Sequence, residues 1–448
     1  MQIEKFFIGN EFVSSDDIVE IKNPYTSEVV KKIYKSGKSH IDISLNYLTA
    51  ISKKYRDIPT YLKSELLEKI SKKISERKNE LATLITSETG KPVKFSRIEV
   101  DRAVLTFKLG SEETKRIEGE VLNLDLLKGS ENVIGIVKRF PLGVILAITP
   151  WNFPINLVAH KLAPALASGN VVLLKPASAS LTCGIELVKI IKESCDELNL
   201  DFCPVNVVTS SGSEIESFIS DQRIKMISFT GSSEVGWNLK KKTNRQKISL
   251  ELGGNAGVIV DESADIKTAV TKIIVGGFGQ AGQSCISVQR VFVHEKIYDE
   301  FEKLLVEKTK KIKIGNPFED DTDVSAMITE DDAKKVEAWI NDALKSGAKI
   351  LTGGSRDKAV LMPTIIADTK KDMSVNFKEV FAPLITLTKF DDFKKAVDEV
   401  NDSLYGLQAG VFTENIINVF YAFNNLETGG VIINNASNYR MDSMPYGG

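Results

Sequence analysis

The stretch GVILAITPWNFPINLVAHKLAPALASGNVVLL, residues 143–174, predicts a strand, a helix and a second strand. Gly143–Ile148 and Asn170–Leu174 are short apolar runs, and Asn156–Ala167 between them has helical character. Such buried runs alternating with helices are typical of a parallel sheet covered on both faces, joined by right-handed crossovers as in nucleotide-binding folds. The same alternation continues through Val205–Val208, Met226–Phe229 and Ile248–Leu252.

The flanking regions differ in character from this series. Residues 1–60 are expected to form short strands and turns, and residues 61–117 a set of charged helices. Two short alternating stretches within residues 119–141 predict a hairpin that reaches away from the core. A second α/β series begins after residue 253, with a helix at Ala264–Phe278, a strand at Val288–Val293 and a helix at Tyr298–Lys311.

Length and composition narrow the class of protein. A chain of 448 residues is too long for one compact core, so more than one domain is expected. The net charge of −2 gives no reason to expect a nucleic-acid partner. We find no signal-peptide pattern and no apolar run long enough for a bilayer, so we expect no membrane contact and a cytoplasmic location. The four cysteines lack metal-ligand spacing, so no metal site is expected.

One cysteine stands out because of its surroundings. Cys285 closes the glycine-bearing loop GQAGQSC, residues 279–285, and Glu251 lies in LELGG, residues 250–254. A thiol nucleophile and a carboxylate base are the parts needed for covalent catalysis through a thioester. Gly277–Gly282 also matches GxGxxG, but a predicted helix precedes it, where a dinucleotide fingerprint needs a strand. We therefore interpret these glycines as a turn that directs backbone amides toward Cys285.

Five further motifs accompany these two: TPWNFP at 149–154, LKP at 174–176, FTGS at 229–232, EVFAP at 379–383 and MPYGG at 444–448. Together, in this order, they resemble the aldehyde dehydrogenase superfamily over nearly the whole chain. The closing NYRMDSMPYGG, residues 438–448, is similar to a branch acting on small, often anionic aldehydes. Lactaldehyde, non-phosphorylating glyceraldehyde-3-phosphate and succinic semialdehyde dehydrogenases belong to that branch.

The resemblance implies a three-part α/β subunit. A Rossmann-like parallel-sheet domain that binds the cofactor is expected from residues 1–118 and 142–252. A second α/β domain, the catalytic one, is expected from residues 253–435. A small β-hairpin oligomerisation element is expected from residues 119–141 with 436–448, incomplete at its C-terminal end. A homodimer or homotetramer would follow.

The resemblance also implies the chemical roles. Cys285 would attack the aldehyde, and the Asn152 amide and the Cys285 backbone N–H would stabilise the oxyanion. Glu251 would activate water to hydrolyse the thioester. From the sequence alone, Asn152 could instead cap the following helix. A CoA-acylating enzyme, a cysteine-dependent acyltransferase or hydrolase, and a non-catalytic binding protein on the same fold stay open as alternatives.

Cofactor contacts follow from the same resemblance. Lys175 would bind the adenosine ribose, Glu379 the nicotinamide ribose, and Phe381 would pack near the nicotinamide. Ser178 replaces a carboxylate found in many relatives that prefer NAD, so we expect NADP to be preferred and NAD to be the alternative. Further cofactor neighbours are expected at Thr149, Pro150, Trp151, Gly212, Phe229, Thr230, Gly231, Ser232, Val235 and Leu252.

Arg102, His160 and Arg440 correspond to positions that line the substrate channel of the small-aldehyde branch. An arginine fork suits a carboxylate or phosphate, so some of these residues are expected to hold an anionic or hydroxylated tail. His160 could instead be a packed helix residue. Ser284 and Ile286, on either side of the nucleophile, complete the expected substrate contacts.

Overall fold

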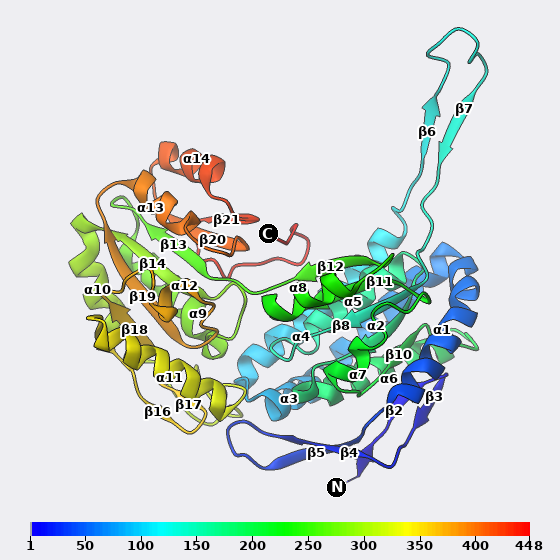
Figure 1. Ribbon diagram of the computed structural model, residues 1–448, viewed down its shortest axis with the longest axis horizontal. Helices are drawn as coiled ribbons and strands as arrows, with labels where there is room; N and C mark the ends of the chain where they lie inside the picture. The colour runs from blue at the N-terminus through cyan, green and yellow to red at the C-terminus, as the bar shows by residue number, and fades with distance from the viewer. Residues whose placement is uncertain (1) are drawn as a thin grey trace.

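The computed structural model describes residues 2–448. Two seven-stranded sheets, each flanked by helices, form two lobes of the molecule (Figure 1). Both sheets are mainly parallel, which confirms the expected α/β fold with two parallel-sheet units. Among residues 2–448, no helix combines the length and the apolar character needed to cross a membrane.

The first sheet has the strand order β12-β11-β8-β9-β10-β2-β3. Its central strands β8 and β9 are buried at every position, as expected for strands covered on both faces. Near one edge β2 pairs antiparallel with both β10 and β3, and the other five strands are parallel to one another. The bounds are β2 Phe6–Ile8, β3 Glu11–Val13, β8 Val144–Ile148, β9 Val171–Lys175, β10 Val205–Val207, β11 Ile224–Thr230 and β12 Lys247–Glu251.

Eight helices belong to this lobe. The helix α5 joins β8 to β9, and α6 joins β9 to β10, so each parallel pair is linked by a helical crossover. A three-stranded sheet of order β1-β5-β4 lies beside them. The bounds are α1 Lys38–Asp57, α2 Thr60–Glu76, α3 Lys78–Thr89, α4 Val93–Thr114, α5 Asn156–Ala167, α6 Leu181–Glu197, α7 Gly212–Glu216, α8 Ser233–Lys242, β1 Ile3–Glu4, β4 Ile18–Lys22 and β5 Val29–Tyr34.

The expectation of strands and turns throughout residues 1–60 is wrong for Lys38–Asp57, which forms the helix α1. Ile41, Leu45 and Leu48 are fully buried at helical spacing, and Tyr55 continues the same face. This apolar stripe packs the helix onto the first sheet. Residues 61–117 do form the expected helices, α2 to α4.

The second sheet has the order β15-β18-β19-β14-β13-β20-β21, parallel except for the edge strand β15. The helix α9 leads to the cysteine loop and ends at Phe278, so a helix precedes Gly279, as the sequence predicted. The bounds are β13 Ala256–Val260, α9 Ile266–Phe278, β14 Val288–His294, α10 Glu295–Thr309, α11 Glu330–Lys345, β15 Lys349–Thr352, β18 Thr364–Ala367, α12 Ser374–Phe377, β19 Leu384–Phe390, α13 Phe393–Asn401, β20 Gln408–Phe412, α14 Ile416–Asn425 and β21 Gly430–Ile433.

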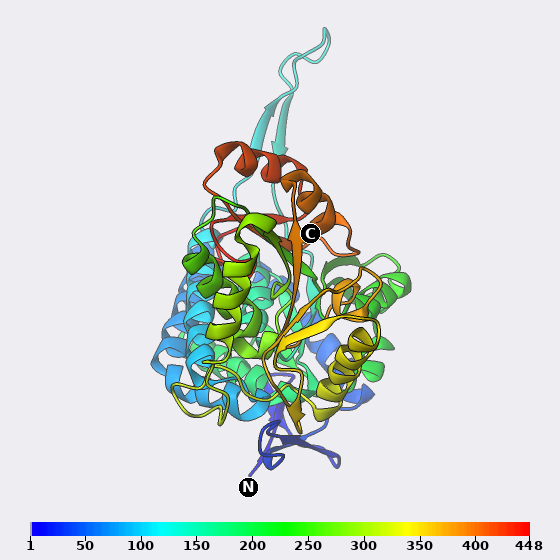
Figure 2. The same cartoon turned by 90° about the vertical axis from the view of Figure 1, so that its left-hand side faces the viewer.

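The predicted hairpin is present as β6 (Glu120–Asn123) paired with β7 (Ile134–Val137). It projects far beyond the rest of the molecule in both views (Figures 1 and 2). Its apolar side chains lie in the open: Val121, Ile134 and Ile136 are each at least 70% exposed.

The topology places a ligand site at a definite point. The chain runs from β8 to β9 and β10 on one side, then returns to β11 on the other side of β8. Ligands of open parallel sheets bind beyond the carboxyl ends of the strands at such a switch point. Thr149 follows β8 and Thr230 ends β11, so both lie at this edge.

Candidate active site

A single cavity of about 1350 Å³ collects the residues that the sequence analysis selected. It receives side chains from the carboxyl ends of the first sheet, from the cysteine loop and from the C-terminal segment, which lies between the two lobes (Figure 1). The lining includes Arg102, Thr149, Pro150, Trp151, Asn152, His160, Lys175, Ser178, Gly212, Phe229, Thr230, Gly231, Ser232, Val235, Glu251, Leu252, Ser284, Cys285, Ile286, Glu379, Phe381 and Arg440. In residues 2–448, no cluster of His, Cys, Asp and Glu side chains could hold a metal ion.

The loop before Cys285 has an unusual backbone. Gln280, Ala281 and Gly282 have φ values of 55°, 53° and 66°, so three consecutive residues adopt the left-handed region. A Cβ on Gly282 would overlap the carbonyl group of Ala382, which explains the glycine there. The Gln283 side-chain oxygen accepts a hydrogen bond from the Ile328 backbone N–H at 2.9 Å and ties the loop to the second lobe.

Asn152 is held against the same loop. Its Nδ2 donates a hydrogen bond to the Gln283 carbonyl at 3.1 Å, and its own carbonyl accepts one from the Gln280 amide. The alternative that Asn152 caps the next helix is wrong, because α5 begins at Asn156 and Ile155 is its N-cap. An amide nitrogen carries two hydrogens, so one remains for a group in the cavity.

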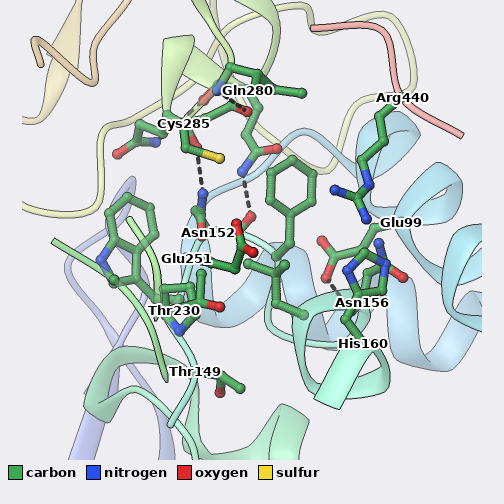
Figure 3. Close-up of a pocket in the computed structure, with 18 of the residues that line it drawn as sticks. Glu99, Thr149, Asn152, Asn156, His160, Thr230, Glu251, Gln280, Cys285 and Arg440 are labelled. Carbon is green, nitrogen blue, oxygen red and sulfur yellow. Dashed lines mark hydrogen bonds between the residues drawn. The ribbon is translucent and has the colours of Figure 1, made fainter. Parts of the chain in front are cut away.

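Glu251 ends the strand β12, and the two glycines after Leu252 explain how it approaches the nucleophile. A Cβ on Gly253 would overlap the Glu379 carboxylate, and a Cβ on Gly254 would overlap the backbone carbonyl of Cys285. The backbone of Cys285 therefore excludes a side chain at position 254, whereas a side chain at position 253 would displace the Glu379 carboxylate. Figure 3 shows the Cys285 sulfur, Asn152 and Glu251 around the same space, with Arg440 and His160 to one side.

The Glu251 carboxylate has no hydrogen bond or salt bridge to any part of residues 2–448. Burial raises its pKa, and the charges of Lys161 and Arg440 lower it. Lys161 is itself buried on α5, with Nζ 3.1 Å from the Ser228 hydroxyl, and burial lowers its pKa to about 7. The sequence analysis missed Lys161; the available signal was a lysine on a largely apolar helix.

The Cys285 sulfur lies 3.1 Å from the Tyr446 hydroxyl. Burial raises the pKa of the thiol to about 11, the Tyr446 hydrogen bond and Arg440 lower it, and Glu251 and Glu379 raise it. Tyr446 was quoted only as part of a motif and received no role from the sequence. Its contact joins residues distant in the chain, which no local pattern reveals.

One end of the cavity suits a nucleotide. Burial lowers the pKa of Lys175, and no carboxylate in residues 2–448 pairs with its ammonium group. The Thr149 hydroxyl is also buried without a hydrogen-bond partner. The unpaired Lys175 ammonium group and the Thr149 hydroxyl, which has no hydrogen-bond partner, suit the phosphate and hydroxyl groups of a dinucleotide. Ser178 is exposed and lines the same cavity, and its side chain carries no negative charge.

Two aromatic rings and a further carboxyl group also line the cavity. The rings of Trp151 and Phe381 stand nearly perpendicular, with centroids 5.7 Å apart. Phe381 has a φ of 52°, a strained value for an aromatic residue. Glu379 accepts a hydrogen bond from the Gly254 backbone N–H at 3.0 Å, and burial raises its pKa to about 7.

The opposite end holds a charged cluster around Asp442, which the sequence analysis missed. Asp442 accepts hydrogen bonds from Arg102 at 2.8 and 3.2 Å and lies 2.7 Å from His160 Nε2. Burial opposes ionisation of Asp442, but the bonds from His160 and Arg102 keep its pKa well below the usual range. The Arg440 guanidinium stacks on Tyr446 at 3.6 Å, and its Nε is buried without a hydrogen-bond partner.

Comparison with known proteins agrees with this geometry. A profile of the Aldehyde dehydrogenase family matches residues 12–448. The 3-sulfolactaldehyde dehydrogenase of Priestia aryabhattai is 40% identical over 443 residues, which cover 99% of this chain and 92% of that protein.

Two solved structures extend the match. Aldehyde dehydrogenase 21 from Physcomitrella patens, in complex with the reaction product succinate, has a TM-score of 0.97 and 39% identity, covering 100% of this chain and 92% of that chain. Glyceraldehyde-3-phosphate dehydrogenase GapN from Methanocaldococcus jannaschii, complexed with NADP, has a TM-score of 0.93 and 37% identity, covering 97% and 94%. The resemblance inferred from the motifs is thereby confirmed, and the chain belongs to the aldehyde dehydrogenase family.

Proposed function

We propose that this aldehyde dehydrogenase oxidises a small aldehyde with an anionic or hydroxylated tail to its carboxylic acid, with NADP preferred over NAD. The observation that carries the proposal is one cavity with three parts. The sulfur, amide and carboxylate of Cys285, Asn152 and Glu251 share this cavity with a part suited to a nucleotide and with the Arg440 guanidinium, whose Nε has no hydrogen-bond partner.

The proposed chemistry assigns one task to each group. The Cys285 thiolate attacks the aldehyde carbon, and the oxygen of the resulting tetrahedral adduct accepts hydrogen bonds from the Asn152 amide and the Cys285 backbone N–H. One such donor lowers the barrier by roughly 3–4 kcal/mol. The nicotinamide cofactor, when bound, supplies the acceptor for the hydride. Glu251 then takes a proton from the water that attacks the thioester, as its free carboxylate allows.

Replacing the two reactive groups separately tests these roles. Cys285→Ser should lower kcat by more than about 10³-fold, because the alcohol is a far weaker nucleophile. Glu251→Gln should keep a rapid first release of NADPH and slow later turnover by about 10²–10⁴-fold. Stopped-flow absorbance of NADPH measures both. An undiminished rate in Cys285→Ser would contradict the proposal. If coenzyme A removes the acyl group from Cys285 faster than water does, the result would favour a CoA-acylating enzyme.

The two sheets suggest that the chain is divided into two domains with different functions. We propose residues 1–118 and 142–252 as the cofactor-binding domain, and residues 253–435 as the catalytic domain. Lys175, Thr149 and Ser178, proposed to meet the adenosine half of the cofactor, belong to the first unit. The Cys285 loop belongs to the second, and Gly253–Gly254 mark the passage between them.

The cofactor preference rests on charge at the rim. Ser178 places no carboxylate near the unpaired Lys175, so a 2′-phosphate meets attraction without repulsion. Ser178→Glu should therefore lower the ratio of kcat/KM for NADP over NAD by at least about tenfold. Ser346→Glu, which adds the same charge at the exposed end of α11, is the matched control and should leave the ratio unchanged. A wild-type enzyme that strongly prefers NAD would refute the proposal.

The substrate class rests on the guanidinium end. The relatives described above carry sulfonate, carboxylate or phosphate groups in the names of their substrates or products. In this chain Asp442 forms hydrogen bonds with Arg102 and His160, whereas Arg440 Nε has no hydrogen-bond partner and lies 3.8 Å from the Asp442 carboxylate. We therefore propose Arg440 as the main contact for the tail, with Arg102 and His160 held beside it and Ser284 and Ile286 nearer the aldehyde.

Arg440→Ala should reveal this selectivity. The value of kcat/KM for succinic semialdehyde and glyceraldehyde 3-phosphate should fall by at least about tenfold more than the value for uncharged lactaldehyde, because only the former lose an ionic hydrogen bond. Steady-state assays of the three aldehydes at fixed NADP give the ratio. Equal losses on charged and uncharged aldehydes would remove Arg440 from the tail site.

The exposed hairpin calls for a partner surface. A lone two-stranded ribbon with apolar side chains in water is marginally stable, so we propose that residues 119–141, with 436–448, contact further copies in a homodimer or homotetramer. Light scattering should show that replacing Ile134 and Ile136 by lysine lowers the assembly mass without loss of helical content. A wild-type monomer would contradict the proposal.

We also propose a cytoplasmic location. The four cysteines, Cys183, Cys195, Cys203 and Cys285, are all free thiols, as is usual in a reducing compartment. Cell fractionation of the tagged protein would locate it.

A further inference from the structure

The Tyr446 hydroxyl stands where a partner for the nucleophile is needed. It lies 3.1 Å from the Cys285 sulfur and forms no other hydrogen bond in residues 2–448. No other side chain in this part of the chain hydrogen-bonds the sulfur. The hydroxyl proton is therefore available to the sulfur alone, and the contact depends on the C-terminal segment that carries Tyr446.

A cation lies on the ring of the same tyrosine. The Arg440 guanidinium carbon is 3.6 Å from the ring centroid, close for a cation over an aromatic face. A positive charge at the ring face withdraws electron density from the phenol, which makes its O–H a stronger donor. Arg440 also lowers the pKa of both Cys285 and Tyr446 through its charge.

The remaining charges around the sulfur act in the opposite direction. Glu251 at the end of β12 and Glu379 before β19 disfavour a thiolate, as does burial. Cysteine nucleophiles often rely on a histidine, but in residues 2–448 no hydrogen bond joins His40, His160 or His294 to this thiol. Tyr446 and Arg440 both favour the charged sulfur.

We infer that Tyr446 is a further catalytic residue, which donates its hydroxyl proton in a hydrogen bond to the Cys285 sulfur and stabilises the thiolate when it forms, with Arg440 stacked on its ring. The thiol proton leaves to water, the phenol keeps its own proton, and no carbon bond changes in this step. When the sulfur bonds to the aldehyde carbon, its charge passes to the carbonyl oxygen and the hydrogen bond to Tyr446 weakens. This inference rests on the proposed nucleophilic role of Cys285.

Alkylation by iodoacetamide tests the inference without aldehyde or cofactor, so it is independent of the proposed oxidation. The rate should follow the thiolate fraction of Cys285, because the other three cysteines are buried. In Tyr446→Phe the midpoint of the rate against pH should rise by about one unit, giving about tenfold slower alkylation near neutral pH. The plateau rate at high pH should be unchanged, since Phe keeps the ring and the sulfur stays in place.

Tyr439→Phe is the matched control, because Tyr439 lies in the same segment and its hydroxyl makes no hydrogen bond there. Its profile should coincide with that of the wild type, and Cys285→Ser gives the background. A Tyr446→Phe midpoint equal to the wild-type value would overturn the inference and leave the contact as packing. If alkylation shifts as expected while no aldehyde is oxidised, the stabilisation of the Cys285 thiolate by Tyr446 stands and the proposed function falls.

Discussion

The active site depends on two glycines, Gly253 and Gly254, that let two backbone segments come close together. Where β12 ends, the backbone passes between the Glu379 carboxylate and the Cys285 carbonyl. A Cβ at Gly254 would collide with that carbonyl, and a Cβ at Gly253 would displace the Glu379 carboxylate. This close approach brings the end of the first sheet against the loop of the second. The left-handed turn at Gln280–Gly282 meets it from the other side, so the carboxylate and the sulfur share one space.

The buried ionisable groups in the cavity lower the stability of the folded protein. Lys161, Lys175 and Glu379 are ionisable groups with pKa values shifted by burial toward their neutral forms. Unpaired buried charges destabilise a folded chain, and proteins keep such groups mainly where function uses them. The Asp442 cluster is different, because its carboxylate is matched by Arg102 and His160 and so holds the far wall in place.

The sequence predicted much of this, for identifiable reasons. The apolar runs of β8 and β9 and the helix between them are local signals, and Asn156–Ala167 was predicted with the observed bounds. The helix α1 was missed, although Ile41, Leu45 and Leu48 follow helical spacing, because it directly follows the short strands β1 to β5 in the sequence. No functional role was assigned from the sequence to Tyr446, Asp442 or Lys161. Their roles depend on contacts between distant parts of the chain, such as that of Tyr446 with Cys285.

The short segment from Arg440 to Tyr446 serves both ends of the proposed chemistry. Arg440 faces the space assigned to the substrate tail and also stacks on the ring that contacts the sulfur. Under the two proposals, selectivity and reactivity are coupled through one side chain. An engineer who exchanges these few residues to admit a different aldehyde would retune the nucleophile in the same operation, and would have to optimise the two properties together.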